Sequence, residues 1–193
     1  MKKSYKVYLF RHGQTFYNKN KIFTGFIDSK LTPKGIKQAK TIAKKLKNKK
    51  FEIAIQTKLS RSKDTLKQVL KFHPECKIIL TDNRMIERSY GKLSGKSHKE
   101  TIEKYGQEQF DKWHRGFNAK LPSGESFADV EKRVKKFTTD LKKLAKKHKT
   151  NIAISAHGNS IRLFRKVLEK LSIKETEKLE IPYDKVFAYK TIA

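Results

Sequence analysis

Residues 6–13 (KVYLFRHG) and 151–158 (NIAISAHG) decide the fold of this chain. Each is a short apolar run that ends in His-Gly, at His12 and at His157. Such runs predict buried strands, and the polar residues after each glycine predict a turn into a helix. In an open parallel sheet, ligands bind beyond the carboxyl ends of the strands. If these two strands are neighbours, two imidazoles and Arg11 meet at one point, a constellation that suits a phosphate.

The rest of the chain alternates between strand and helix patterns. Strands are expected at 5–11, 52–57, 77–81, 151–157 and 185–191. Helical spacing covers 33–48, 59–71, 97–117 with a break at Gly106, 126–147 and 159–171. This alternation predicts an α/β fold with three layers (α/β/α), in which a mostly parallel sheet carries helices on both faces. The last strand follows Pro182 and is expected at an edge. With no repeat or linker in 193 residues, we expect one domain over 1–193.

The chain is strongly basic, with 47 Lys and Arg against 19 Asp and Glu and a net charge of +28. The lysines are spread over the whole chain, including 40–50 and 142–149, and such blocks usually solvate helix faces. A nucleic-acid footprint is the alternative, but no nucleic-acid motif accompanies the charge. We therefore expect no specific nucleic-acid partner, and a field that attracts small anions.

Cysteine usage and hydropathy place the chain in a reducing compartment. A single cysteine, Cys76, excludes an internal disulfide and a multi-cysteine metal site. The first apolar run spans only 7–10, which is too short for a signal peptide, and no stretch reaches membrane-spanning length. A cytoplasmic protein without a membrane partner is expected. His73 and His148 lie in charged surroundings and are expected at the surface.

Residues 11–15 (RHGQT) combine residue types that suit the binding and transfer of a phosphoryl group. A neutral imidazole such as that of His12 can carry a phosphoryl group as a covalent intermediate. Arg11 offers several donors to phosphoryl oxygens, and Gly13 would let the backbone approach an anion closely. A core histidine at a strand end is the alternative, which this segment alone does not exclude.

The run 11–18 (RHGQTFYN) resembles the signature of the histidine phosphatase superfamily. Further segments, in the family's order between residues 6 and 189, resemble its cofactor-dependent phosphoglycerate mutase branch: 23–26 (FTGF), 57–65, 87–95 (ERSYGKLSG), 104–117, 156–162 (AHGNSIR) and 179–182 (LEIP). An ordered set of motifs is far more specific than any one of them.

The resemblance implies a role for each matching residue. His12 would be the phosphorylated nucleophile, Glu87 the general acid and base, and His157 a catalytic partner at the phosphoryl group. The phosphate would be bound by Arg11, Asn18, Arg61, Gly158 and Asn159. The rest of the substrate would be bound by Thr24, Gly25, Arg88, Tyr90, His98, His114 and Arg115.

The reaction that the resemblance implies is the interconversion of 3-phosphoglycerate and 2-phosphoglycerate in glycolysis and gluconeogenesis. It would be primed by 2,3-bisphosphoglycerate and would need no metal. The expected partner is a small anionic phosphorylated substrate, and a homodimer is possible.

Three departures from the mutase pattern keep an alternative open. His114 stands where mutases carry an arginine, and His98 where they carry a substrate-binding lysine. The chain also passes from Phe117 to 124–126 (GES) without the long mutase insertion, as phosphatase branches do. A mutase must keep its phosphoenzyme from water, so the alternative is a histidine-type phosphatase acting on a small phosphomonoester. A third function, a catalytically idle basic nucleic-acid module, is disfavoured by the intact set His12, His157, Arg11, Arg61 and Glu87.

Overall fold

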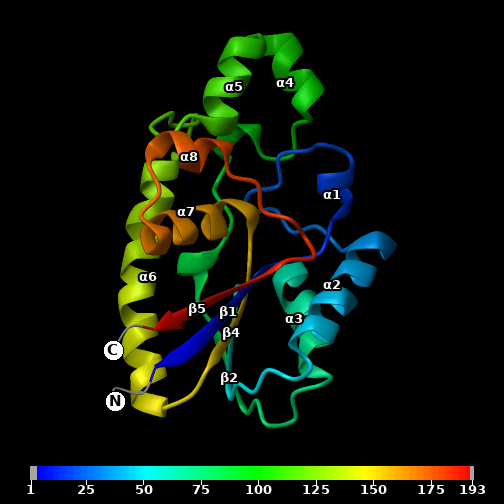
Figure 1. Cartoon of the computed structure of the whole chain (residues 1–193). Coiled ribbons are helices and arrows are strands. Elements are labelled where there is room, and N and C mark those ends of the chain that lie inside the picture. The colour runs from blue at the N-terminus through cyan, green and yellow to red at the C-terminus, as the bar shows by residue number, and fades with distance from the viewer. Residues whose placement is uncertain (1–3, 192–193) are drawn as a thin grey trace.

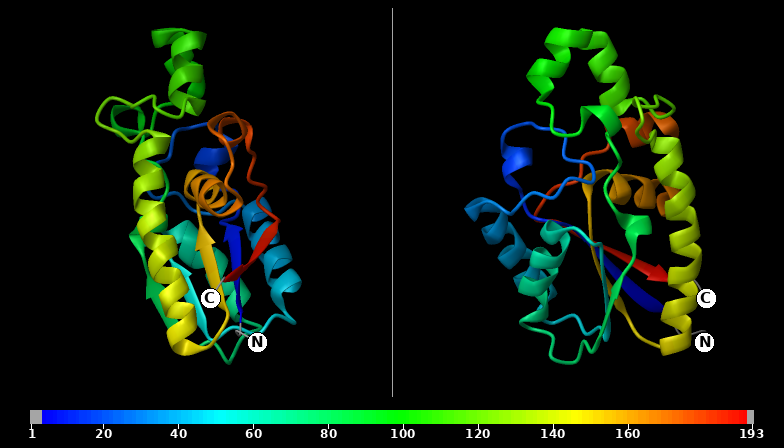
Figure 2. Two further views of the ribbon diagram at one scale, coloured as in Figure 1. Left: turned by 60° about the vertical axis from the view of Figure 1, so that its left-hand side comes forward. Right: turned by 180° about the vertical axis from the view of Figure 1, so that it is seen from behind.

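A computed structural model describes residues 4–191 and contains a five-stranded sheet (Figures 1 and 2). Across the sheet the order is β3 (Ile78–Thr81), β2 (Ile53–Gln56), β4 (Ile152–Ala156), β1 (Tyr5–Arg11) and β5 (Val186–Thr191). The first four are parallel, and β5 runs antiparallel to β1 at the edge. The mostly parallel sheet, its five strands and the edge position of the last strand are thus confirmed.

The strands β1 and β4 are direct neighbours, and their register sets up the site. Arg11, the last residue of β1, pairs with Ala156, the last residue of β4. The next residue continues this ladder, since the His12 amide donates to the Ala156 carbonyl at 3.0 Å. His12 and His157 therefore leave the same edge of the sheet side by side.

Two helix layers cover the sheet, as predicted (Figure 1). Strand side chains alternate between the faces. In β1, Val7 and Leu9 pack with α6 (Phe127–His148) and α7 (Gly158–Glu169), while Tyr8 and Phe10 pack with α2 (Pro33–Leu46) and α3 (Ser60–Leu70). The two cores are separate because consecutive side chains point to opposite faces.

The lysine blocks lie on the solvent faces of these helices. In α2, the buried positions are Gly35, Ala39, Ile42, Ala43 and Leu46, and the lysines between them are exposed. Thr32 caps this helix through its hydroxyl, which accepts from the Gly35 amide at 3.0 Å. The helix is thus specified by an apolar stripe and a cap, and the lysines solvate its outer face.

Two helices, α4 (His98–Tyr105) and α5 (Gln107–Arg115), project beyond the carboxyl edge of the sheet (Figures 1 and 2). The predicted break between them is confirmed at Gly106, whose φ of +81° favours glycine. Four shorter pieces were not predicted, because each is too short to show helical periodicity: α1 (Phe16–Lys19), α8 (Ile173–Lys178) and the 3₁₀ turns η1 (Asn83–Met85) and η2 (Gly91–Leu93).

One surface prediction is wrong. His148 is exposed as expected, but His73 is only 2% exposed. Its ring lies 4.2 Å from that of Phe51, and its Nδ1 lies 2.9 Å from Glu75. The charged residues around His73 in the sequence indicated a surface position, but the chain turns there and directs the imidazole inward. Among residues 4–191, no helix combines the length and the apolar character needed to cross a membrane.

Candidate active site

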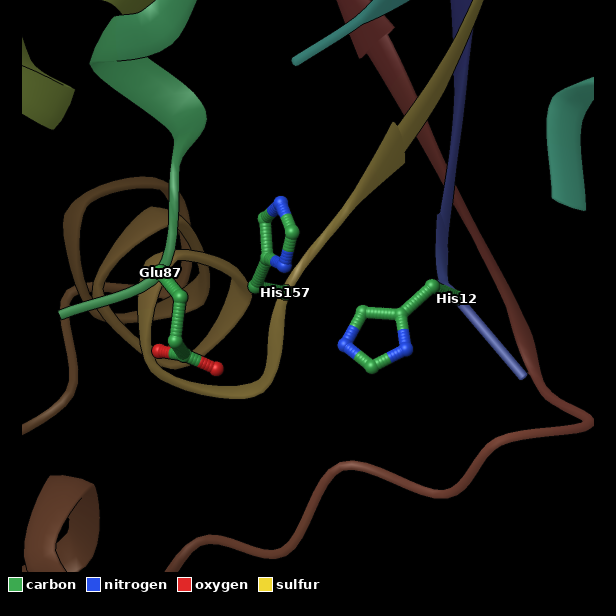
Figure 3. Close-up of side chains that lie close together, drawn as sticks. All are labelled: His12, Glu87 and His157. Atoms are coloured by element: carbon green, nitrogen blue, oxygen red, sulfur yellow. The ribbon is translucent and has the colours of Figure 1, made fainter. Parts of the chain in front are cut away.

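His12 and His157 lie together at the carboxyl edge of β1 and β4, with Glu87 opposite them (Figure 3). The two ring centroids are 5.0 Å apart, and both imidazoles are buried. One ligand atom from each of the three residues falls within 4.8 Å of the others. The condition that the two strands are neighbours is met, and the two His-Gly runs meet at one point.

The surroundings of His12 fix its protonation state. Its Nδ1 lies 2.7 Å from the Gly13 carbonyl, which only accepts, so Nδ1 carries the proton. Burial lowers the pKa of His12 well below its usual value, and the charges of Arg61 and Arg11 lower it further. The ring is therefore neutral near pH 7, and its Nε2 lone pair is available as a nucleophile.

Gly13 also permits a close contact within the protein itself. A Cβ at this position would lie 2.2 Å from the Gly35 carbonyl oxygen, and one at Gly35 would lie 2.1 Å from the Gln14 carbonyl oxygen. The glycines thus allow the start of α2 to pack against the segment after β1. The close contact joins two backbone segments, residues 13–14 and Gly35, and it supports the segment that carries His12.

His157 is the more deeply buried imidazole. Its Nε2 lies 2.8 Å from the Thr57 hydroxyl, which can donate its hydrogen to that nitrogen. Nδ1 is buried and has no hydrogen-bond partner among the described residues. Burial, followed by the charge of Arg61, lowers the pKa of His157 well below its usual value. A neutral ring with Nδ1–H unpaired is suited to donate to an oxygen of a bound anion.

Glu87 is held by the backbone. Its Oε1 accepts from the amides of Arg88 at 2.8 Å and Asn159 at 3.1 Å. Arg133 donates to the Glu87 carbonyl at 3.0 Å and clamps the loop from below. One carboxylate oxygen is therefore fixed, which leaves the other for a proton on a substrate oxygen.

Three arginines, of which Arg61 and Arg162 are buried and Arg11 is half-buried, supply positive charge around the histidines. Arg61, on α3, donates to the carbonyls of Gly25 at 2.8 Å and Ile27 at 2.9 Å, and burial lowers its pKa. Arg11 donates to the Ile181 carbonyl at 2.9 Å. Burial also lowers the pKa of Arg162, to about 9, and its side chain bonds the Leu179 carbonyl and Asn159. Such a concentration of positive charge favours an anionic ligand.

Most of these groups line a cavity of about 490 Å³. Its size suits a small ligand. Most of the predicted site residues line it: Arg11, His12, Asn18, Thr24, Arg61, Glu87, Tyr90, His98, His114, Arg115, Gly158 and Asn159. Within it, Asn18 uses its Oδ1 to accept from Thr15, so its amide nitrogen is available as a donor.

The sequence pattern of the histidine phosphatase superfamily (branch 1) matches residues 7–190. The chain belongs to this superfamily. Among curated relatives, the 2,3-bisphosphoglycerate-dependent phosphoglycerate mutase 2 of Gloeobacter violaceus is 34% identical over 90% of this chain and 80% of its own. The corresponding mutase of Chlamydia abortus is 32% identical, with coverage of 94% and 91%, and that of Methanococcus vannielii is 31% identical, with 89% and 84%.

Solved structures of other proteins share the fold of this chain. The α-ribazole phosphatase of Shigella flexneri superposes with a TM-score of 0.81 at 22% identity, covering 95% of this chain and 89% of its own. A phosphoglycerate mutase of Bacillus anthracis superposes with a TM-score of 0.78, also at 22% identity, covering 97% and 88%. Mutases and phosphatases thus share this architecture, and the fold alone does not separate them.

Three residues predicted for the superfamily site do not line the cavity. His157 is fully buried, with its ring centroid 5.0 Å from that of His12, and the Gly25 carbonyl accepts from Arg61. Arg88 is fully buried and donates to the Trp113 carbonyl at 2.9 Å, with its guanidinium over the rings of Tyr90 and Phe127. Arg88 thus ties the Glu87 loop to α5. Loop spacing in a sequence does not show which way an arginine faces.

The two histidines that replace mutase cations form an uncharged wall. Burial, followed by the charge of Arg115, lowers the pKa of His114 to about 3. Burial and then Lys21 lower the pKa of His98. Their rings lie 5.2 Å apart and pack against Phe23 and Phe110 at centroid distances between 4.5 and 6.1 Å. Neither imidazole is a cation near neutral pH.

Several lining residues were not predicted as substrate contacts: Lys21, Arg162, Glu180 and Tyr183. Arg162 follows His157 by five positions on α7, so helical spacing could place it near the site but not decide its role. Tyr183 follows the matched segment 179–182, and no sequence signal pointed to it.

The triad His12, Glu87 and His157 has the separation of a metal site, but its surroundings oppose one. Arg11 and Arg61 lower the pKa of both imidazoles, and the same positive potential repels a divalent cation. A positive potential that repels a metal ion stabilises a bound anion, so the donor set fits a phosphoryl group better than a metal.

Proposed function

We propose that this superfamily member is a phosphoglycerate mutase that interconverts 3-phosphoglycerate and 2-phosphoglycerate through phosphohistidine at His12, primed by 2,3-bisphosphoglycerate. The observation that carries the proposal is that the cavity has two groups of cations. Arg11 and Arg61 adjoin His12, while Lys21 and Arg115 adjoin the wall of His98 and His114. Two groups suit a substrate with a second anionic group away from the reacting phosphate, as the curated relatives named as mutases would require.

The geometry supports a two-step exchange. Nε2 of His12 attacks phosphorus, so that the N–P bond forms while the ester O–P bond breaks and its electron pair passes to the leaving oxygen. Glu87 donates a proton to that oxygen, then removes one from the hydroxyl that attacks the phosphohistidine in reverse. Arg11, Arg61 and His157 stabilise the charge on the phosphoryl oxygens, where positioning and electrostatics contribute most.

One observation favours a second function, hydrolysis of a small phosphomonoester. The short link 118–125 packs against the Glu87 loop, where Lys92 donates to the Pro122 carbonyl at 2.9 Å and Glu125 to the Ser89 carbonyl at 3.0 Å. No residue of this link lines the cavity. The phosphoenzyme is therefore less covered than one beneath a long insertion, and we expect some leakage of phosphate to water.

A product assay separates the two functions. The protein is incubated with 3-phosphoglycerate, with and without 2,3-bisphosphoglycerate, while ³¹P NMR follows 2-phosphoglycerate and inorganic phosphate together. We expect isomerisation to exceed hydrolysis and to depend on the bisphosphate. Faster release of phosphate than of 2-phosphoglycerate, with the bisphosphate present, would establish the phosphatase.

Restoring a mutase cation at His114 is expected to improve isomerisation. His114→Arg adds a permanent charge beside Arg115, and a charged hydrogen bond worth about 1.5 kcal/mol would lower KM for 3-phosphoglycerate roughly tenfold. The ratio of isomerisation to hydrolysis should rise, as measured by initial rates of both products. His148→Arg, on the exposed end of α6, is the matched control and should change neither. An unchanged ratio in His114→Arg would show that the wall of His98 and His114 takes no part in substrate binding.

We also propose that the protein acts in glycolysis and gluconeogenesis in the cytoplasm, where its one thiol, Cys76, stays reduced.

We further propose that the protein forms a homodimer. The edge strand β3 exposes Ile78, Ile79 and Leu80, whose exposed fractions are 36%, 49% and 37%. Its outer side pairs with no strand of the described chain. Antiparallel pairing of two copies would cover these side chains and bring Lys77 of one copy near Asp82 of the other.

A charge in this edge is expected to separate the copies. Ile79→Lys should convert the dimer into a monomer by light scattering after gel filtration, because two lysines would be buried near the two-fold axis. Ile173→Lys, at a 46% exposed position on α8, should leave the dimer intact. A wild-type chain that is monomeric at micromolar concentration would contradict this interface.

A further inference from the structure

Tyr183 lies on a strap that the rest of the molecule holds firmly. The strap, defined here as residues 179–184, connects α8 to β5. Three of its carbonyls accept hydrogen bonds from cationic side chains. Arg162 bonds Leu179 at 3.0 Å and 2.9 Å, Arg11 bonds Ile181 at 2.9 Å, and Lys45 bonds Asp184 at 2.7 Å. These contacts come from α7, β1 and α2, so the ring of Tyr183 is presented to the cavity from a fixed backbone.

The ring of Tyr183 stacks on Arg11. The guanidinium carbon lies 3.9 Å from the ring centroid. On the same guanidinium, a Cβ built at Gly158 would come within 3.3 Å of that carbon, so the backbone at the start of α7 also adjoins it closely. The ring also meets the imidazole of His12 in an edge contact, with centroids 6.4 Å apart.

This arrangement leaves most N–H groups of the Arg11 guanidinium available to a ligand. Its one hydrogen bond among the described residues goes from NH1 to Ile181, and Nε is buried without a partner. A guanidinium has five N–H donors in a rigid plane. The single hydrogen bond to Ile181 leaves the plane free to rotate about it, so the stack on Tyr183 completes its orientation.

We propose that Tyr183 is a positioning residue for the phosphoryl transfer, which holds the Arg11 guanidinium so that its free N–H groups meet the oxygens of the phosphoryl group on His12. This inference rests on the proposed chemistry at His12 but not on the mutase reaction. In the transfer, the Nε2–P bond forms and the ester O–P bond breaks. Arg11 stabilises the charge on the oxygens that neither bond involves, and Tyr183 keeps it in place without touching the phosphoryl group.

The experiment is a double-mutant cycle on phosphorylation of His12. Wild type, Arg11→Ala, Tyr183→Ala and the double variant are mixed with ³²P-labelled 2,3-bisphosphoglycerate, and acid-labile protein label is followed by rapid quench. We expect Tyr183→Ala to slow labelling by about tenfold, in line with a desolvated cation–π contact, with little change in the concentration for half-maximal rate. The effect should disappear when Arg11 is already alanine, because the ring then has nothing to position.

Two further variants guard the interpretation. Tyr183→Phe keeps the ring and should label at the wild-type rate, whereas a merely structural hydroxyl contact would not be rescued. Tyr105→Ala, at an exposed tyrosine of α4 outside the cavity, should also label normally. Additive losses from Arg11→Ala and Tyr183→Ala, or a Tyr183→Phe variant as slow as Tyr183→Ala, would overturn the proposal.

If wild type takes no label, the proposed mutase chemistry fails while the role of Tyr183 remains testable. The same cycle is then run on hydrolysis of p-nitrophenyl phosphate, in which Arg11 meets the same kind of phosphoryl group. The expected result is again a loss in kcat that is absent without Arg11, and additivity again counts against Tyr183.

Discussion

Replacing His12 by alanine is expected to lower kcat by at least about 10⁴-fold, since loss of a covalent nucleophile commonly has effects of this order or larger. The neutral ring presents Nε2 while Nδ1–H is committed to the Gly13 carbonyl, and no other nucleophile lines the cavity in that position. Incubation with 2,3-bisphosphoglycerate should give the wild type an acid-labile, alkali-stable phosphoryl adduct that is missing from His12→Ala.

The control for this loss is a histidine far from the site. His148→Ala, at the exposed end of α6, should retain both turnover and the adduct. His12→Ala that still forms the adduct would move the nucleophile elsewhere, and His157 would become the first residue to test.

The second large effect is expected at Glu87. Glu87→Gln should slow isomerisation by about 10³-fold, within the range usual for a lost general acid and base. The glutamine carbonyl can still accept from the amides of Arg88 and Asn159, so the loop should keep its shape. Hydrolysis of p-nitrophenyl phosphate should fall far less, because nitrophenolate leaves without a proton. Steady-state rates on both substrates provide the comparison.

A second carboxylate in the cavity makes a matched control. Glu180→Gln removes the same charge from the exposed rim of the same cavity and should alter isomerisation less than tenfold. Equal losses on both substrates in Glu87→Gln would assign Glu87 a structural part rather than proton transfer.

The architecture was predictable because the strands and helices of each layer show a regular pattern of apolar residues in the sequence. The runs at 5–11 and 151–157 are apolar and bounded by turns, and the stripe along α2 repeats at helical spacing. What the sequence could not show is that β1 and β4 are neighbours in register, since 140 or more residues separate them along the chain. The resemblance implies only that His12 and His157 act at the same phosphoryl group, and the pairing of Arg11 with Ala156 supplies the register that brings them together.

The site was predictable where a residue type is demanded by chemistry, and less so where direction matters. His12 and Glu87 meet at one point as expected. Arg88, expected at the substrate, is buried against Phe127, whereas Arg162, whose role spacing leaves open, lines the cavity. Tyr183 gave no signal because it acts by stacking, a contact that depends on the path of the strap.

The most direct measurement follows the fate of a phosphoryl group already on His12. The protein is labelled with ³²P from 2,3-bisphosphoglycerate, freed of excess reagent, and mixed with a saturating amount of unlabelled 3-phosphoglycerate in a single turnover. The proposed mutase predicts that most of the label passes to organic phosphate, as bisphosphoglycerate or phosphoglycerate, before any large fraction reaches water. Label recovered chiefly as inorganic phosphate, at a rate that 3-phosphoglycerate does not alter, would contradict it.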